Sequence, residues 1–139
     1  MDRITKEQRS EIMGRVRSKD TGPEMVVRRA THAMGFRYRL HSRMLPGQPD
    51  LVFASRRKVI FVHGCFWHGH GRCRNVRPPK SNKRYWGPKL EGNKKRDRKN
   101  RRALSRMGWR ILVVWECQTS DAQVLSRRIR AFLDGHESQ

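Results

Sequence analysis

The apolar residues of this chain of 139 residues fall into short runs whose spacing predicts several secondary-structure elements. Two runs, residues 51–54 and 58–63, are separated only by the polar residues 55–57, which predicts an antiparallel hairpin of two strands. Residues 109–115 form a third run that is largely apolar without strict alternation. That pattern is typical of a strand that is covered on both faces of its sheet.

Helical spacing is predicted in four further segments, residues 6–17, 21–34, 89–107 and 121–133. Pro23 suits the first turn of the second helix, and Gly35 is expected to end it. In the last helix, the residues expected to face inward are Val124, Leu125, Ile129 and Phe132. Residues 74–85 are basic and contain proline, so they are expected to form a loop. The order of elements predicts an α/β fold in which a small mixed sheet is flanked by helices, as a single domain over residues 1–139.

The charge of the chain indicates what kind of partner the protein binds. Lys and Arg total 33 against 12 Asp and Glu, a net charge of +21, and fifteen of the cations lie between Arg72 and Arg106. Such a surface indicates a polyanion, with nucleic acid favoured over a membrane surface. The apolar runs are too short to span a bilayer, and the first residues lack the apolar stretch of a signal peptide. We therefore expect a cytoplasmic, nucleoid-associated protein, in which cysteines serve as metal ligands or free thiols.

Two isolated carboxylates are candidates for metal-dependent chemistry. Asp50 opens the first strand of the predicted hairpin, and the second strand returns beside it with His63 at its end. The two side chains could bind a divalent cation such as Mg²⁺ and polarise a phosphate, although an Asp at this position can also cap a turn. Glu24 lies in the first turn of a predicted helix, where the helix dipole alone would favour an acid. The structural and functional interpretations of Glu24 are evenly balanced.

Residues 63–73 are dense in histidine and cysteine. The spacing Cys65-x4-His70-x2-Cys73 suits a tetrahedral zinc site, which needs a fourth ligand. Cys117 and His68 are the alternatives for that position, and Cys117 could instead be a buried thiol. His63 and a His68 that is not a zinc ligand could each act as a general base or hydrogen-bond donor.

Aromatic residues interrupt the most basic stretch of the chain. Phe66, Trp67, Tyr85 and Trp86 are surrounded by glycine and cationic residues, which makes simple burial a weaker explanation than for the tryptophans of the last strand. Aromatic side chains among cations suit stacking on bases or wedging between them.

Five motifs occur in a fixed order along residues 9–117. They are Arg15-x-Arg17-x-Lys19-Asp20-Thr21 followed by Glu24, Leu45-Pro46-Gly47-Gln48-Pro49-Asp50, Phe61-Val62-His63-Gly64-Cys65-Phe66-Trp67-His68, Asn93-x-x-Arg96-Asp97, and Gly108-Trp109-Arg110 leading to Val114-Trp115-Glu116-Cys117. With these motifs the chain resembles the very-short-patch repair (Vsr) endonucleases, bacterial enzymes that nick DNA at T:G mismatches.

This resemblance implies a restriction-endonuclease-like core in which Pro49-Asp50 matches the first half of the PD-(D/E)xK pattern. Phe61 and His63 occupy the positions of the usual acid and lysine. Asp50 would ligate catalytic Mg²⁺ with the main-chain carbonyl of Val62. His68 would be the general base, His63 would support the phosphate, and Glu24 would be a further functional carboxylate.

The resemblance also implies roles outside the cutting site. The structural zinc ligands would be Cys65, His70, Cys73 and Cys117. The residues that wedge into the duplex would be Phe66, Trp67 and Trp86, and residues 1–20 would contact the DNA from another side. The chain differs from a well-known member of this family in two places. Val62 stands where that relative has a threonine, and one more residue separates His70 from Cys73.

The function implied is a Mg²⁺-dependent endonuclease that acts, as a monomer, on double-stranded DNA with a T:G mispair. It would nick the T strand 5′ to the mispaired base, and MutL-type repair proteins are candidate partners. Such mispairs arise when 5-methylcytosine deaminates. Two alternatives remain: a nuclease of the same fold with another lesion or site as its target, and a non-catalytic zinc-stabilised DNA-binding protein.

Overall fold

The computed structural model describes residues 21–65, 68 and 83–135. In this part of the chain, four strands form one mixed sheet in the order β1-β2-β3-β4. The strands are β1 (Arg39–Leu40), β2 (Leu51–Phe53), β3 (Lys58–His63) and β4 (Arg110–Trp115). The predicted helix over residues 6–17 lies outside the described residues. Strand β1 is too short to produce a sequence pattern, and it was not predicted.

The predicted hairpin is confirmed. Strands β2 and β3 pair antiparallel, with Leu51 opposite Ile60, and a turn of 3₁₀ helix over Ala54–Arg56 joins them. Arg57 completes the reversal in the left-handed region at φ 55°. Strand β4 then pairs with β3 in parallel, which places Trp115 beside His63. The end of β3 therefore has β4 on one side and the start of β2 on the other.

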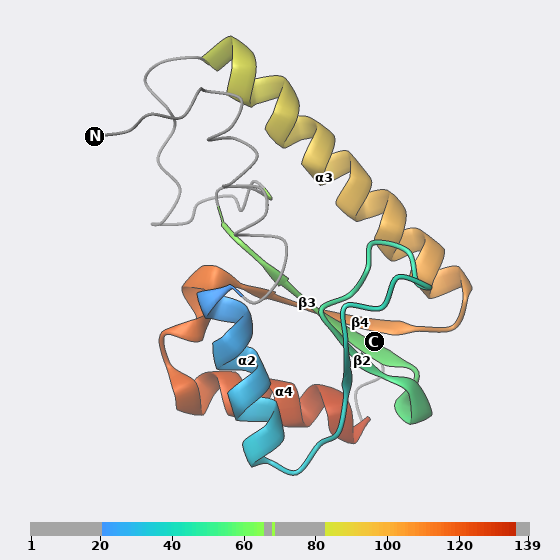
Figure 1. Ribbon diagram of the computed structural model, residues 1–139, viewed down its shortest axis with the longest axis vertical. Helices are drawn as coiled ribbons and strands as arrows, with labels where there is room; N and C mark the ends of the chain where they lie inside the picture. The colour runs from blue at the N-terminus through green and yellow to red at the C-terminus, as the bar shows by residue number, and fades with distance from the viewer. Residues whose placement is uncertain (1–20, 66–67, 69–82, 136–139) are drawn as a thin grey trace.

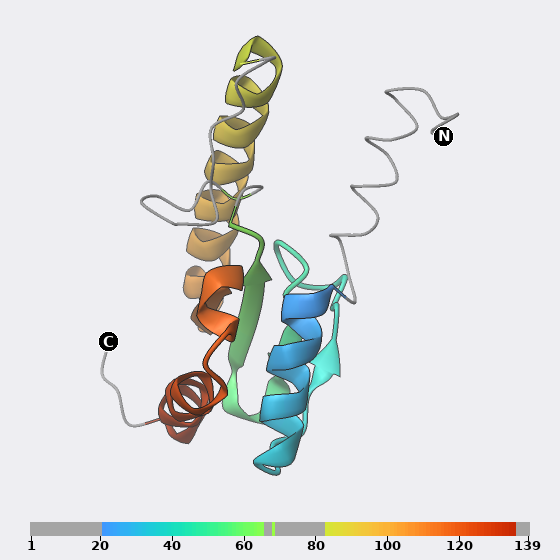
Figure 2. The ribbon, with the colours of Figure 1, turned by 90° about the vertical axis from the view of Figure 1, so that its left-hand side faces the viewer.

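Helices cover both faces of the sheet (Figures 1 and 2). The three helices of the described residues are α2 (Gly22–Ala33), α3 (Lys83–Arg106) and α4 (Ala122–Asp134). Successive residues of a strand point to opposite faces, so each strand supplies two cores. On one face Ile60 and Val114 pack with α2 and α4, and on the other Val59 and Phe61 pack with Leu104 of α3. The mixed α/β architecture that we predicted is confirmed.

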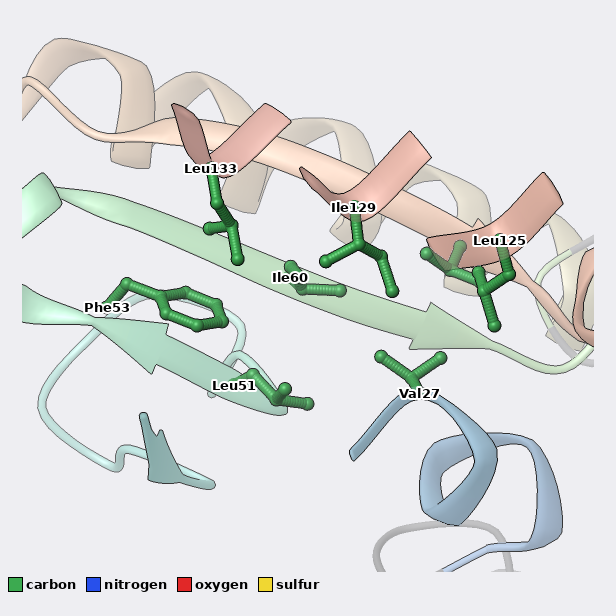
Figure 3. Packing of buried hydrophobic residues seen from close by; sticks show 8 residues of the cluster. Val27, Leu51, Phe53, Ile60, Leu125, Ile129 and Leu133 are labelled. Carbon is green, nitrogen blue, oxygen red and sulfur yellow. The ribbon is translucent and has the colours of Figure 1, made fainter. Parts of the chain in front are cut away.

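The larger core lies between the sheet and helices α2 and α4 (Figure 3). Helix α4 contributes Leu125, Ile129 and Leu133, which are four residues apart and share one face. Each such side chain, when fully buried, contributes about 1.5–3 kcal/mol. The prediction that Val124 faces inward was wrong. Val124 is 52% exposed, because it lies about a quarter of a turn away from the buried face.

Two cationic side chains of the hairpin, Arg56 and Lys58, cap the last turn of α4. Arg56 donates a hydrogen bond of 2.9 Å to the carbonyl of Leu133, and the Nζ of buried Lys58 lies 3.3 Å from the same oxygen. Helix C-termini carry unpaired carbonyls and a partial negative charge, which explains how a lysine can be buried there. This arrangement ties the turn between β2 and β3 to the end of the chain's last helix.

Helix α3 begins at Lys83, earlier than we predicted. The expectation of a loop over residues 74–85 was therefore wrong from residue 83 onward. Pro88 lies inside the helix, where it removes one backbone donor near the first turns without ending the helix. No helix in the described part of the chain is both long and apolar enough to cross a membrane.

Candidate active site

A pocket opens where β2 begins and β3 ends, beneath helix α3. Four of the predicted site residues line it: Asp50, Val62, His63 and His68. Its other lining residues are Gly47, Gln48, Phe61, Asp97, Asn100 and Arg101. The pocket thus combines candidate metal ligands, candidate proton-transfer groups and the cationic side chain of Arg101.

The turn that precedes Asp50 is shaped to fit against α3. Gly47 and Gln48 both have left-handed backbones, with φ of 77° and 49°. A Cβ atom on Gly47 would lie only 3.0 Å from the Cβ of Asn100. Glycine therefore serves two purposes here, since it adopts this φ without strain and allows the turn to approach the helix closely. Pro49 is buried, and Asp50 follows at the floor of the pocket.

Asp50 is bound to the opposite strand of the hairpin. Its Oδ2 accepts a hydrogen bond of 2.7 Å from the main-chain N–H of Val62. Burial raises the pKa of Asp50 to about 7, the Val62 hydrogen bond opposes this rise, and the nearby charge of Glu24 adds to it. A carboxyl in this environment is half protonated near neutral pH. It favours a bound cation, which would replace the proton and offset the charge of Glu24.

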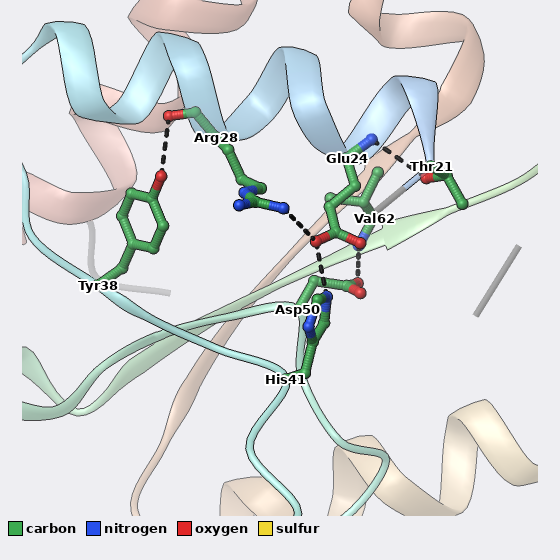
Figure 4. A network of polar contacts seen from close by, with 7 residues as sticks. All are labelled: Thr21, Glu24, Arg28, Tyr38, His41, Asp50 and Val62. Carbon is green, nitrogen blue, oxygen red and sulfur yellow. Dashed lines mark hydrogen bonds and ion pairs between the residues drawn. The ribbon is translucent and has the colours of Figure 1, made fainter. Parts of the chain in front are cut away.

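Glu24 reaches the same place from helix α2, and it is only 1% exposed (Figure 4). Thr21 caps this helix by accepting a hydrogen bond from the N–H of Glu24. The Oε2 of Glu24 lies 2.7 Å from the Nε2 of His41 and 3.6 Å from a guanidinium nitrogen of Arg28. The ligand atoms of Glu24, His41 and Asp50 all lie within 4.8 Å of one another. Two carboxylates and an imidazole at this spacing suit a divalent cation.

The two histidines predicted for catalysis are stacked on each other. The rings of His63 and His68 are nearly parallel, with centroids 3.8 Å apart and an angle of 5° between their planes. Burial, together with the charge of His68, lowers the pKa of His63 to about 3. His63 is therefore a neutral imidazole, and its Nδ1 has no hydrogen-bond partner among the described residues.

Asp97 is the partner of His68. Its Oδ2 lies 2.6 Å from the Nδ1 of His68. Burial alone would raise the pKa of Asp97, but the hydrogen bond and charge of His68 outweigh burial and lower it. An ionised Asp97 holds a proton on Nδ1, which leaves Nε2 as the ring nitrogen that can accept one.

The expectation that Asp50 and His63 together hold a cation is refined by this geometry. Both line the pocket, but among the described residues the possible metal ligands fall into two groups of three, and His63 belongs to the group with His68 and Asp97 rather than to that of Asp50. Sequence reasoning gave no role to His41 or Asp97. Asp97 shares the signal that identified Asp50, because it is an isolated acid in a basic segment. His41 has no comparable signal.

The predicted zinc site is described only in part. Cys65 follows β3, Cys117 follows β4, and the Sγ of Cys65 lies 3.4 Å from the main-chain nitrogen of Cys117. Because β3 and β4 are parallel neighbours, their ends bring the two cysteines together. The two cysteines thus come together where the sequence predicts two of the four zinc ligands. His70, Cys73, Phe66 and Trp67 lie outside the described residues, as does the arm of residues 1–20, and Trp86 falls in α3.

The cationic surface of α3 continues outward from the pocket. Arg101 lines the pocket itself and also a shallow groove along the helix. The other residues of this groove are Arg98, Arg102, Ser105 and Arg106. A phosphate backbone that followed these residues would lead into the pocket.

Three sequence comparisons bear on this site. Residues 1–74 match the family model described as DNA mismatch endonuclease Vsr. A type II nicking enzyme, V.XorIIP of Xanthomonas oryzae pv. oryzae, is 53% identical over 96% of this chain and 97% of its own length. The DNA mismatch endonuclease Vsr of Escherichia coli is 38% identical over 78% of this chain and 69% of its own.

A comparison of folds gives a more distant relative. The catalytic domain of the homing endonuclease I-Bth0305I superposes with a TM-score of 0.59, at 18% sequence identity. The alignment covers 86% of this chain and 100% of that domain. At this level of identity, the similarity concerns the fold alone.

Proposed function

The chain belongs to the Vsr family of DNA mismatch endonucleases, and from this premise and the geometry of its pocket we propose a Mg²⁺-dependent enzyme that nicks DNA at T:G mispairs. It would cut the T strand 5′ to the mispaired base and so begin very short patch repair. One observation carries the mechanism: Asp50 and the His68–Asp97 pair open onto the same pocket. A restriction-endonuclease-like core is part of the proposal, supported by Pro49-Asp50 and the shared fold.

Asp50 of the pocket and the adjacent carboxylate of Glu24 would hold the cation. Asp50 is the first ligand, Glu24 lies beside it, and the main-chain carbonyl of Val62 is the third predicted contributor. A bound Mg²⁺ would stabilise negative charge on the scissile phosphate. The hydrogen bond that Asp50 accepts from the main-chain N–H of Val62 in β3 fixes the orientation of its carboxylate. The backbone of the hairpin therefore sets the position of this ligand.

His68 would remove the proton from the attacking water. Asp97 fixes the ring and its tautomer, so that Nε2 accepts the proton and the ionised Asp97 stabilises the imidazolium that forms. His63 is neutral and buried, so it would support the phosphate as a hydrogen-bond donor, and its stacked ring keeps His68 in its orientation.

Selection of the mispair would depend on residues around the pocket. Phe66, Trp67 and Trp86 would wedge beside the T:G pair, whose weak stacking makes this deformation less costly than in a paired duplex. Residues 1–20 would hold the duplex from another side. Zinc bound by Cys65, His70, Cys73 and Cys117 would fix the loop that carries the aromatic residues. The enzyme acts as a monomer in this scheme, with MutL-type repair proteins as candidate partners.

A nicking assay on a panel of duplexes tests the proposal. Duplexes with T:G, T:A or C:G at one position, in several sequence contexts, are incubated with Mg²⁺ or with EDTA, beside an Asp50→Ala variant. We expect Mg²⁺-dependent nicking of the T strand at T:G alone, and an Asp50→Ala variant that binds DNA but does not cut. Equal nicking of paired duplexes would instead indicate a related nuclease with another target. Salt-sensitive binding without cleavage under any divalent cation would indicate a DNA-binding protein.

A further inference from the structure

His41 contacts both acidic residues of the proposed cation site, the main chain of Asp50 through its own main chain and the carboxylate of Glu24 through its side chain. Its backbone N–H donates a hydrogen bond of 3.1 Å to the main-chain carbonyl of Asp50. Its Nε2 lies 2.7 Å from the Oε2 of Glu24, and the tautomer that carries its proton on Nε2 donates a hydrogen bond to that oxygen. His41 is thus the described residue that bridges the helix of Glu24 and the turn of Asp50 (Figure 4).

The backbone of His41 is adapted to this contact. The residue follows β1 with a φ of 48°, a left-handed conformation that costs a non-glycine residue about 1 kcal/mol or more. Histidine is among the residues that adopt it more often than most. In Figure 4 the imidazole of His41 faces the carboxylate of Glu24, in the first turn of α2.

Apart from its interaction with Asp50 itself, the other contacts of Glu24 described above come from its own helix. Thr21 is the N-cap of α2 and Arg28 lies one turn further along it. Contacts within one helix cannot fix the helix relative to a neighbouring turn. The contact with His41 can, because it joins two elements that lie 17 residues apart in the sequence.

We propose that His41 is a positioning residue, which holds Glu24 at the distance from Asp50 where both carboxylates bind one divalent cation. This inference rests on the proposed role of Asp50 and Glu24 as cation ligands. Groups that orient metal ligands typically change metal affinity or activity by about 10–100-fold when they are removed. His41 itself need not contact the cation or the DNA.

Binding of Mn²⁺ to the full chain without DNA, followed by electron paramagnetic resonance, tests this role independently of nicking. His41→Asn keeps a residue that tolerates the left-handed backbone but shortens the side chain so that it no longer reaches Glu24. His41→Gln restores a donor of greater reach. His32→Asn, at an exposed position near the end of α2, is the matched control.

We expect His41→Asn to weaken Mn²⁺ binding about tenfold, while His41→Gln stays within about threefold of the wild type and His32→Asn is unchanged. The Mg²⁺ concentration for half-maximal nicking should rise in parallel for His41→Asn. Glu24→Gln and the double variant with His41→Asn should bind Mn²⁺ equally, since His41 acts through Glu24.

Two results would overturn the proposal. One is wild-type Mn²⁺ affinity in His41→Asn, and the other is a further loss of affinity when His41→Asn is added to Glu24→Gln. Thermal unfolding of each variant shows whether a loss of affinity comes from failed folding, and if His41→Asn does not fold, the affinity of a folded His41→Gln relative to the wild type decides. A wild-type chain that fails to nick T:G duplexes would refute the proposed function but would leave the Mn²⁺ comparison fully interpretable.

Discussion

The imidazole of His63 lies flat against that of His68, with 3.8 Å between the ring centroids. One ring is buried and neutral, while the other is held by the carboxylate of Asp97. In the proposed mechanism the stack separates two tasks, because His63 fixes the plane of the neighbouring ring and His68 exchanges a proton with the pocket.

Replacing Asp97 by Asn should slow nicking strongly while leaving DNA binding unchanged. The amide has nearly the same shape, but it neither fixes the Nδ1–H tautomer of His68 nor stabilises an imidazolium. A positioned general base contributes about 10²–10⁴-fold to a rate, so we expect a loss of at least about 100-fold in single-turnover nicking. Asp134→Asn, near the exposed end of α4, is the control. A rate within threefold of the wild type would exclude Asp97 from proton transfer.

Asp50→Asn should stabilise the protein at pH 8 in EDTA. The pKa of Asp50 is raised from 3.8 to about 7 by burial, so the folded state binds its proton more tightly than the unfolded state does. Protonation of Asp50 therefore contributes to the stability of the folded state in full below pH 3.8, and this contribution is lost as the pH rises through 7. A shift of this size corresponds to at most about 4 kcal/mol. Thermal unfolding at pH 5 and pH 8 should show a gain for Asp50→Asn that is larger at pH 8.

The same experiment in the presence of Mg²⁺ supplies the control. The cation should raise the unfolding temperature of the wild type at pH 8 and leave Asp50→Asn unchanged, because a ligand of the folded state stabilises it only where the site exists. An identical response of the two proteins to Mg²⁺ would show that the cation does not bind at Asp50.

Gly47→Ala should damage the site more than Gly35→Ala. Both glycines have left-handed backbones, with φ of 77° and 87°, so both substitutions cost about 1–2 kcal/mol from strain. A Cβ on Gly35 meets no atom within 4 Å, whereas one on Gly47 meets the side chain of Asn100 at 3.0 Å. Denaturant unfolding should therefore show the larger loss for Gly47→Ala, and only this variant should nick more slowly. Equal effects would show that the turn moves freely against α3.

The wild-type chain should bind one zinc ion, and Cys117→Ser should lose it. Cys65 and Cys117 lie together at the ends of parallel strands, and zinc that closes a loop contributes directly to folding. Elemental analysis of the purified protein measures the metal, and thermal unfolding with a zinc chelator should show a lower transition for the wild type only. A folded, active preparation without zinc would contradict the prediction.

Local patterns predicted most of the elements that the structure describes. The hairpin was predictable because two apolar runs flank a three-residue turn, and β4 because its apolar run is long enough to be covered on both faces. Helices α2 and α4 have N-cap residues that mark where they begin, Thr21 and Asp121. Strand β1 has only two residues, which is too few for any periodic signal.

The site was predictable only where its residues are close in the sequence or stand out from their surroundings. Asp50 and His63 belong to one hairpin, so their approach follows from the turn between them. The contact of His68 with Asp97 spans 29 residues, and its existence depends on how α3 packs across the sheet. The contact of His41 with Glu24 likewise depends on a left-handed residue after β1, which no periodic pattern indicates.

The parallel pairing of β3 with β4 has a consequence for the order in which the protein is made. Asp50, His63 and His68 all leave the ribosome long before β4, yet β3 cannot complete its hydrogen bonds until β4 joins it. Asp97 and Cys117 also come from the later part of the chain. A nascent or truncated chain would therefore carry the residues for cutting without the framework that aligns them. The topology delays assembly of a cutting site until most of the polypeptide has been synthesised.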